Sequence, residues 1–176
     1  MEAACSLERL PGIGLLEQTP MILEKLLLAV PPEMLEWKPS TERWSVSEVL
    51  GHLAETEETF RERTRRMIEE DLPFLESYDQ NASHAAGNYS GRPAREQLKR
   101  FCHKRDRALA WLRYLPAGVA TRTGRHAELG QITVGELMNE WAFHDLGHIR
   151  QIAELYRARA FYPEMGAFQR YYTVRP

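Results

Sequence analysis

Apolar residues recur at spacings of three and four positions through most of this chain, whereas alternation with a period of two is almost absent. A spacing of three to four keeps apolar side chains on one face of an α-helix, and strict alternation would indicate β-strands. The length of 176 residues fits the usual size of one domain. We therefore expect an all-α fold that forms a single domain over residues 1–176.

The same pattern, together with helix start and stop signals, predicts four helical segments. They cover residues 14–30, 45–70, 93–115 and 133–157. Pro31 and Pro32 end the first segment, because a proline has no amide hydrogen to donate. Pro20 lies inside that segment and leaves two alternatives open. Either a regular helix starts at Pro20 after a Thr19 cap, or a longer helix is kinked there.

The second and fourth segments begin with the same capping box. Ser45 precedes Glu48 by three residues, and Thr133 precedes Glu136 by three. In a capping box the hydroxyl and the carboxylate satisfy backbone amides that the first helical turn leaves unpaired. An apolar residue precedes each cap and can pack on the next turn of the helix. These two helix starts are the clearest local signal in the sequence.

The connections between the four segments are longer than ordinary helix-to-helix loops, which have about 2 to 8 residues. Such long connections usually have a function, and covering one end of a helical bundle is one such function. The connection over residues 71–92 is the best candidate for a lid. It carries three aromatic residues and a histidine: Phe74, Tyr78, Tyr89 and His84.

The charged residues indicate a solvated surface. With 23 basic and 25 acidic side chains, the net charge of −2 gives no overall attraction to nucleic acid or to an anionic membrane. Eight basic residues between Arg92 and Arg113 predict an outer helix face that is balanced by acids elsewhere, and an anionic partner is the alternative. Glu57 with Arg61, and Glu62 with Arg66, are spaced as ion pairs on a solvated face.

The cysteines and the first residues indicate a cytoplasmic protein. Cys5 and Cys102 lie far apart, which suits free thiols in a reducing compartment better than a disulfide framework. Cys102 falls in an apolar stripe and is expected to be a small core residue. The first ten residues lack the basic and apolar regions of a secretory signal. No apolar stretch approaches the roughly 20 residues of a membrane-spanning helix.

Three histidines form a candidate metal site. His144 and His148 are four residues apart, so they differ by about 40° around a helix axis and about 6 Å along it. One helix can thereby offer two imidazoles to one ion, although a chance pair on a helix surface is the alternative. His52 lies seven residues beyond Ser45 and can face the fourth segment. Three neutral imidazoles with an open fourth position are the ligands of a catalytic zinc or a related divalent ion.

Several neighbouring residues have two possible roles. His144-Asp145-x-x-His148 has the outline of a metalloprotease motif with aspartate in place of glutamate. The shorter side chain moves the base away from the metal, and we favour a contact within the bundle or a dimer for Asp145. Gln151 can support a ligand, touch substrate or be an ordinary surface residue. For Glu55 we favour a solvated face over a role near the metal. Surface positions are expected for the remaining histidines, His84, His103 and His126.

Two stretches resemble the signatures of the DinB-like metalloprotein superfamily: residues 44–53, which open the second segment, and residues 144–152 in the last one. The resemblance spans nearly the whole chain. It implies an up-down-down-up four-helix bundle in which one histidine of the second helix and two of the fourth bind a divalent metal. The matched positions are His52, His144 and His148. Zinc or nickel is expected, with iron and manganese as alternatives, because all four accept imidazole.

The resemblance also implies a class of activity. That family includes thiol-dependent transferases and isomerases that use bacillithiol, mycothiol or glutathione, and its members are frequently dimers. We expect a metal-dependent transferase or hydrolase that acts on a small molecule, with a low-molecular-weight thiol as a possible second cofactor. A non-catalytic binding bundle with a structural or absent metal is the alternative. Phe143 and Leu146 lie off the main apolar stripe, which predicts that the C-terminal tail or a second copy in a homodimer covers them.

Overall fold

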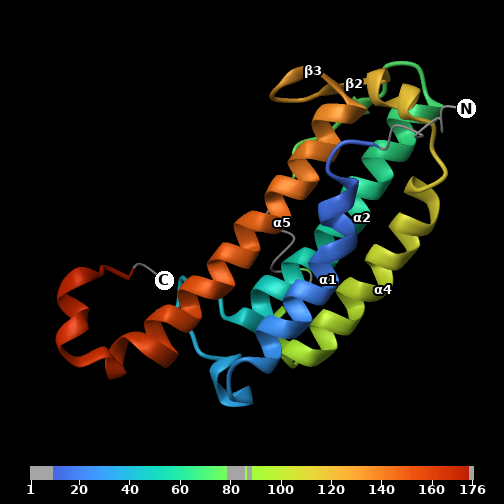
Figure 1. The fold of residues 1–176 in the computed structure, drawn as a ribbon. Helices are drawn as coiled ribbons and strands as arrows, with labels where there is room; N and C mark the ends of the chain where they lie inside the picture. The colour runs from blue at the N-terminus through green and yellow to red at the C-terminus, as the bar shows by residue number, and fades with distance from the viewer. Residues whose placement is uncertain (1–9, 79–85, 87–88, 175–176) are drawn as a thin grey trace, which may run out of the picture.

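The computed structural model describes residues 10–78, 86 and 89–174. Four long helices lie side by side (Figure 1): α1 (Ile13–Leu28), α2 (Val46–Glu69), α4 (Ala94–Leu112) and α5 (Val134–Tyr156). They confirm the four helical segments predicted from the sequence, and their ends differ from the prediction by a few residues, as is usual where helices fray.

Two apolar clusters show in which direction each helix runs. The first cluster joins the starts of α1 and α5 to the ends of α2 and α4, through residues that include Leu16, Met67, Leu109 and Met138. The second cluster joins the opposite ends, through residues that include Leu23, Leu50, Phe101 and Ile152. Helices α1 and α5 therefore run antiparallel to α2 and α4. This is the up-down-down-up order that the resemblance to the DinB-like superfamily implied.

Both predicted capping boxes are present. The Ser45 hydroxyl accepts from the Glu48 amide at 3.2 Å, and the Glu48 carboxylate accepts from the Ser45 amide at 2.9 Å. Thr133 and Glu136 form the same pair of bonds, at 3.1 Å and 2.7 Å. These contacts fix the starts of α2 and α5, the two helices that carry the candidate histidines.

Helix α1 continues through Pro20 and begins at Ile13, so the alternative in which a helix starts after a Thr19 cap is wrong. Pro20 has no amide hydrogen, and it therefore leaves the carbonyl of Leu16, one turn earlier, without its helical partner. That carbonyl accepts a hydrogen bond from Arg105 Nη1 at 2.8 Å instead. The proline thus creates an acceptor for a buried side chain of α4.

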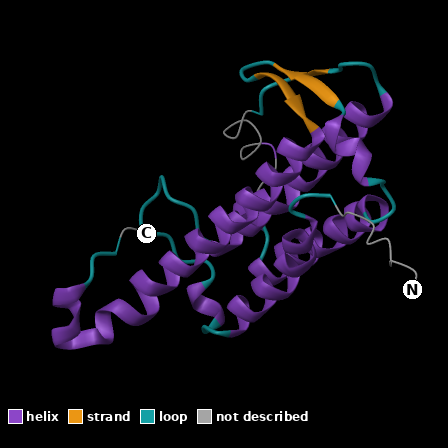
Figure 2. Ribbon diagram, turned by 45° about the horizontal axis from the view of Figure 1, so that its top comes forward, coloured by secondary structure: helices purple, strands orange, loops and turns teal. Residues whose placement is uncertain are grey.

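A small sheet covers the end of the bundle where α2 ends and α5 begins (Figure 2). It contains β1 (Phe74–Leu75), β2 (Thr123–His126) and β3 (Gly130–Thr133), with β1 parallel and β3 antiparallel to β2. The long connections after α2 and α4 supply these strands, which confirms that they cover one end of the bundle. The sequence pattern did not predict the strands, because they have only two to four residues each.

The chain after α5 leads away from the bundle. A π-helical turn (Arg157–Phe161) and a 3-10 segment (Tyr162–Tyr171) project beyond the other helices in Figures 1 and 2. Phe143 and Leu146 of α5 remain 74% and 49% exposed, so the tail does not cover them and that alternative is wrong. Within the described part of the chain, no helix combines the length and the apolar character needed to cross a membrane.

Candidate metal centre

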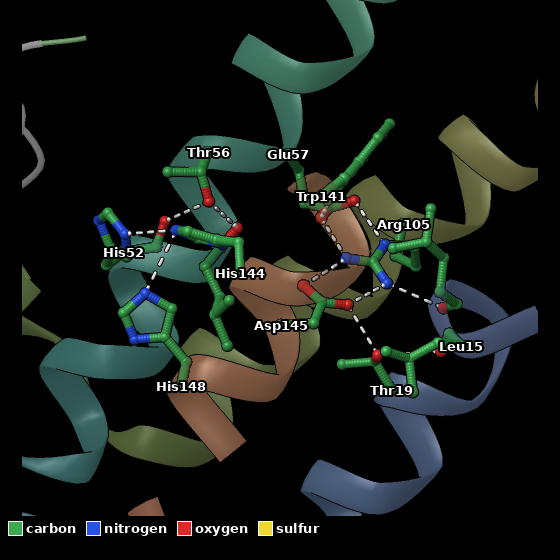
Figure 3. Close-up of polar contacts among 12 residues, drawn as sticks. Leu15, Thr19, His52, Thr56, Glu57, Arg105, Trp141, His144, Asp145 and His148 are labelled. Atoms are coloured by element: carbon green, nitrogen blue, oxygen red, sulfur yellow. Dashed lines mark hydrogen bonds and ion pairs between the residues drawn. The ribbon is translucent and has the colours of Figure 1, made fainter. Parts of the chain in front are cut away.

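Three imidazole rings from two helices converge at one point, as Figure 3 shows. Nε2 of His144 on α5 lies 3.1 Å from Nε2 of His52 on α2 and 3.2 Å from Nε2 of His148, one turn further along α5. One ring nitrogen from each of the three lies within 4.8 Å of the other two. The structure therefore brings together the three histidines that the sequence singled out.

These separations suit a shared metal ion. A nitrogen ligand lies about 2.0 to 2.1 Å from zinc, which places two tetrahedral ligand atoms about 3.3 Å apart. Hydrogen bonds explain the cluster less well. Each Nε2 atom of a neutral ring carries either a proton or a lone pair, so three that converge cannot satisfy one another in every pair. A single cation can accept all three lone pairs.

The surroundings of His144 and His148 favour the neutral ring, which is the form of histidine that binds metal. Burial, together with the charges of His148 and His52, lowers the pKa of His144 to about 2. Burial also lowers the pKa of His148, and a hydrogen bond with Gln151 acts in the opposite direction. At neutral pH these two rings have lone pairs to offer.

Gln151 orients one of the rings. Its Oε1 atom lies 2.9 Å from Nδ1 of His148. Because an amide oxygen can only accept, Nδ1 of His148 carries the proton and Nε2 keeps the lone pair that faces the other two histidines. Of the roles that the sequence left open for Gln151, the contact fits the one in which it orients a candidate ligand, His148.

Close packing holds the His52 ring in place. The ring centroid of Trp44 lies 5.0 Å from that of His52. On the neighbouring residue Gly51, a Cβ atom would lie 3.1 Å from the ring of Tyr89 and 2.9 Å from Nε2 of Gln97. Only glycine allows these two side chains to approach α2 so closely. Gly51, which belongs to the family-like stretch over residues 44–53, therefore allows Tyr89 and Gln97 to pack closely against α2 beside His52.

Asp145 lies on the opposite side of α5 from the histidine rings (Figure 3). Its carboxylate accepts from Arg105 Nη1 at 2.8 Å, from Arg105 Nη2 at 3.1 Å and from the hydroxyl of Thr19 at 2.7 Å. This confirms the expected contact within the bundle. Because its oxygens bind Arg105 and Thr19, Asp145 cannot serve as the base of a metalloprotease, and that alternative is wrong.

Glu57 belongs to the same buried cluster, and its predicted solvated pair with Arg61 is wrong. Its carboxylate accepts from Nε of Arg105 at 2.8 Å and from the indole of Trp141 at 3.0 Å. Burial raises the pKa of Glu57, although the bonds with Arg105 oppose the shift. The predicted pair of Glu62 with Arg66 is wrong too. The surface pairs on α2 are Arg61–Glu58, Arg65–Glu62, Arg65–Glu69 and Arg66–Glu70.

Acidic residues balance much of the basic run on α4, as the plain interpretation predicted. Arg100 and Lys104 pair with Glu55 of α2, and Arg113 pairs with Glu17 of α1 at 2.9 Å. Glu55 is therefore part of a surface ion-pair network rather than a group beside the histidines. Arg105 is the exception in this run, because it is fully buried in the bundle.

Two cavities open at the histidines. The first has a volume of about 550 Å³ and extends between α2 and α5 to the sheet. The second has a volume of about 710 Å³ and lies between α5 and residues that include Arg43 and Thr173. His144 and His148 line both cavities, so a bound ion would be accessible from two sides.

Residues from the predicted lid and from the sheet complete the first cavity. Tyr78 lines it, with its ring centroid 6.1 Å from that of His52. His126 is buried and lines it as well, so its predicted surface position is wrong, whereas His103 is exposed as expected. His84 lies outside the described residues.

The sequence interpretation missed Thr59, Arg63 and Glu140, which also line the first cavity. A helical-face pattern could have found them. Positions 52, 56, 59, 60 and 63 share one face of α2, and positions 136, 140, 144 and 148 share one face of α5. Listing the residues that lie three or four positions apart from His52 along α2, and from His144 along α5, would have identified Thr59, Arg63 and Glu140.

Replacing Gln151 with alanine is expected to weaken zinc binding by about 10- to 100-fold, because His148 loses the acceptor that orients it. Competition with a fluorescent zinc chelator measures this affinity. Gln18→Ala, at an exposed position on α1, is the matched control and should leave the affinity unchanged. Equal affinities for wild type and Gln151→Ala would show that the contact does not support the ligand.

Comparison with known proteins agrees with this geometry. The sequence model of the DinB superfamily matches residues 15–152. A protein of Oceanobacillus iheyensis that bears the name "Putative metal-dependent hydrolase" is 26% identical over 143 residues, which cover 81% of this chain and 83% of that protein. The structure is also similar to that of YfiT from Bacillus subtilis, described as a probable metal-dependent hydrolase with an unusual four-helix bundle topology. The TM-score is 0.74 and the identity 24%, over 84% of this chain and 85% of YfiT.

Proposed function

The chain belongs to the DinB superfamily, and on that premise we propose that it is a hydrolase that depends on a divalent metal ion bound by His52, His144 and His148. The observation that carries the proposal is the convergence of three Nε2 atoms at the mouths of two cavities. The names of the Oceanobacillus and Bacillus relatives support the same class of reaction. The substrate is a small molecule that fits the cavity beside the histidines.

A divalent ion in this setting supplies a Lewis acid and lowers the pKa of a bound water toward about 7. The chain supplies the surroundings of the reaction. Phe60 and Leu137 add apolar side chains to the lining of the cavity, against which an apolar part of the substrate can pack. Glu140 lies one turn before His144 and lines the same cavity, where its carboxylate can accept a proton from the attacking group.

The second cavity favours a second candidate function, the transfer of a small-molecule thiol to an electrophile. Because His144 and His148 line both cavities, two reactants can approach the same ion from different sides. The thiol would come from outside the chain. Cys102 lies on α4, where it packs against an apolar cluster and burial raises the pKa of its thiol, which disfavours the reactive thiolate.

Chelation tests the proposed hydrolysis. The zinc- or nickel-loaded protein is incubated with a panel of small esters and amides, before and after treatment with a chelator. Turnover of at least one substrate, lost on chelation and restored by the metal, is the expected result. A protein that holds one ion per chain but shows no chelator-sensitive turnover contradicts the proposal. Turnover that appears only when a thiol and an electrophile are added together favours the transfer reaction instead.

We also propose that a second copy of the chain covers the exposed apolar residues of α5 in a cytoplasmic homodimer. Phe143 and Leu146 lie one turn of helix apart, and the tail leaves both exposed. Light scattering at micromolar concentration is expected to give twice the mass of one chain, and the double variant Phe143→Ser/Leu146→Ser is expected to give the mass of one. A single-chain mass for the wild type would exclude the dimer.

A further inference from the structure

Arg63 differs from the other arginines of α2. Arg61, Arg65 and Arg66 each pair with a carboxylate three or four residues away. The guanidinium of Arg63 donates to the backbone carbonyl of Glu76 and, among the described residues, has no carboxylate within ion-pair distance. Within the part of the chain that the structure describes, Arg63 is thus the one arginine of these four without a paired carboxylate.

Arg63 lines the cavity that begins at the histidines, and it is half-buried there. Burial lowers the pKa of its guanidinium, and the more distant charge of Glu128 opposes the shift. An arginine nevertheless stays charged in proteins. A partly desolvated cation without an anion is unfavourable, and an anion that enters the cavity would relieve that cost.

His126 adds a second donor on the same side of the cavity. It lies opposite Leu75 in the sheet, and Glu76, whose carbonyl binds Arg63, follows Leu75 directly. Nδ1 of His126 accepts a hydrogen bond from the Glu128 amide at 3.2 Å. In the neutral ring the proton is therefore on Nε2, which has no partner among the described residues, while the ring lines the cavity.

Arg63 lies toward the end of α2 that the sheet covers, and His126 belongs to that sheet, whereas His52 lies near the start of α2. Arg63 follows His52 by eleven residues on α2, which corresponds to about 16 Å along the helix axis. The lining between the two ends includes Phe60, Ile132 and Leu137. The cavity thus has a reactive end, an apolar middle and a cationic far end.

The α5 wall of the cavity has the opposite charge. Glu136 and Glu140 line that wall, and the Glu136 carboxylate is held by the amide and the hydroxyl of Thr133 at 2.7 and 2.9 Å. Hydrogen bonds with Thr133 lower the pKa of Glu136, so it stays ionised at neutral pH. These carboxylates repel an anion from the α5 wall and direct it toward Arg63 and His126.

We propose that Arg63 and His126 form an anion-binding subsite, and that the substrate is an elongated acid whose carboxylate or similar anionic group lies there while its reactive group faces the three histidines. This inference rests on the proposed function and specifies its substrate class. Each guanidinium bond to a carboxylate is charge-assisted, and such bonds are about twice as strong as neutral ones.

A matched set of metal-binding ligands tests the subsite in the full-length, zinc-loaded protein. A hydroxamate binds the ion through its two oxygens, and its tail then extends into the cavity. Suberic acid monohydroxamate ends in a carboxylate, octanohydroxamate in a methyl group and 8-aminooctanohydroxamate in an ammonium. By calorimetry, the wild type is expected to bind the carboxylate-tailed ligand about tenfold more tightly than the methyl-tailed one.

Arg63→Gln is expected to abolish this preference and to leave the affinity for octanohydroxamate unchanged. Arg61→Gln is the matched control, because Arg61 pairs with Glu58 and does not line the cavity, and it should keep the preference. Equal affinities for the three tails in the wild type, tightest binding of the ammonium tail, or an unchanged preference in Arg63→Gln would each overturn the subsite.

A second measurement separates failure of the subsite from failure of the metal centre. In His148→Ala without metal, nuclear magnetic resonance titrations compare octanoate with its neutral analogue octanamide. Tighter binding of octanoate that disappears in the double variant His148→Ala/Arg63→Gln supports the subsite even if the wild type binds no zinc. Equal binding of octanoate and octanamide overturns the subsite, whatever the outcome for the metal.

Discussion

Replacing Arg105 with methionine is expected to lower the free energy of unfolding by about 3 to 5 kcal/mol, the usual cost of removing one partner from a buried ion cluster. The Arg105 guanidinium makes bonds to two buried carboxylates, Glu57 and Asp145, and to the carbonyl of Leu16. Burial disfavours its charge, but the bonds to Glu57 and the charge of Asp145 outweigh this effect and raise its pKa. Methionine fills a similar volume, so most of the lost stability comes from leaving the buried carboxylates of Glu57 and Asp145 without their cationic partner. Urea unfolding measures it.

The loss in Arg105→Met should depend on pH in a defined direction. Burial already holds the pKa of Glu57 above the ordinary value of 4.5 for a glutamate, and removing Arg105 raises that pKa further. In the window between 4.5 and the raised pKa, the folded variant binds more protons at Glu57 than the unfolded chain does. Its free energy of unfolding therefore falls as the pH rises through this window, and the defect shrinks toward acidic pH.

A control at the end of the same helix distinguishes the effect of breaking the buried cluster from the general effect of removing one positive charge. Arg113→Met breaks an ion pair with Glu17 in which the arginine is 52% exposed, and it should cost less than about 1 kcal/mol. If Arg105→Met does not fold at neutral pH, Arg105→Lys keeps the charge and permits the same comparison. Equal losses of unfolding free energy for Arg105→Met and Arg113→Met would contradict the claim that the buried ion cluster stabilises the fold. A loss for Arg105→Met that is independent of pH would contradict it too.

Replacing His144 with alanine is expected to weaken zinc binding by more than about 100-fold, because even the loss of a residue that only orients a ligand costs about 10- to 100-fold. His144 is the central histidine of the three candidate ligands, since its Nε2 lies close to both other Nε2 atoms. Zinc at about 1,000 times the wild-type Kd should raise the free energy of unfolding of the wild type by about 4.1 kcal/mol. The same zinc concentration should raise that of His144→Ala far less.

Chemical unfolding with and without zinc measures this difference. His103→Ala removes an exposed histidine from α4 and should respond to zinc as the wild type does. Helical circular dichroism without zinc establishes that each variant is folded before the comparison. Equal stabilisation of wild type and His144→Ala by zinc would mean that the ion binds elsewhere on the chain.

Local signals in the sequence were sufficient to predict the four helices. Capping boxes at Ser45 and Thr133 mark two helix starts through contacts between residues three positions apart, and such contacts do not depend on the rest of the fold. The spacing of His144 and His148 likewise follows from the helix alone. His52 was predicted to belong to the same site because of its position near the start of its own helix and because of the family resemblance.

The buried cluster could not be predicted in this way. Glu57 and Arg61 have the spacing of a surface ion pair, but Glu57 faces the interior and binds Arg105 on another helix. Its partners lie 48 positions away on α4 and 84 positions away on α5, so no local pattern connects them. Only the packing of the helices decides which face of α2 is buried.

The far end of the cavity was missed for a related reason. His126 ends the four-residue strand β2, which pairs with β1 at Leu75, a residue distant in the sequence. Arg63 is one of four arginines within six residues of α2, and nothing local distinguishes it from those that form ion pairs. Only the tertiary structure shows that Arg63 lines the cavity and that it has no ion-pair partner among the described residues.

Anomalous diffraction from crystals of the zinc-loaded protein, recorded at the zinc absorption edge, tests the metal centre most directly. One peak per chain is expected, about 2.0 to 2.1 Å from an Nε2 atom of each of His52, His144 and His148. A peak at any other group of side chains would contradict a centre built from these three rings. The absence of a peak from crystals soaked in saturating zinc would contradict it as well.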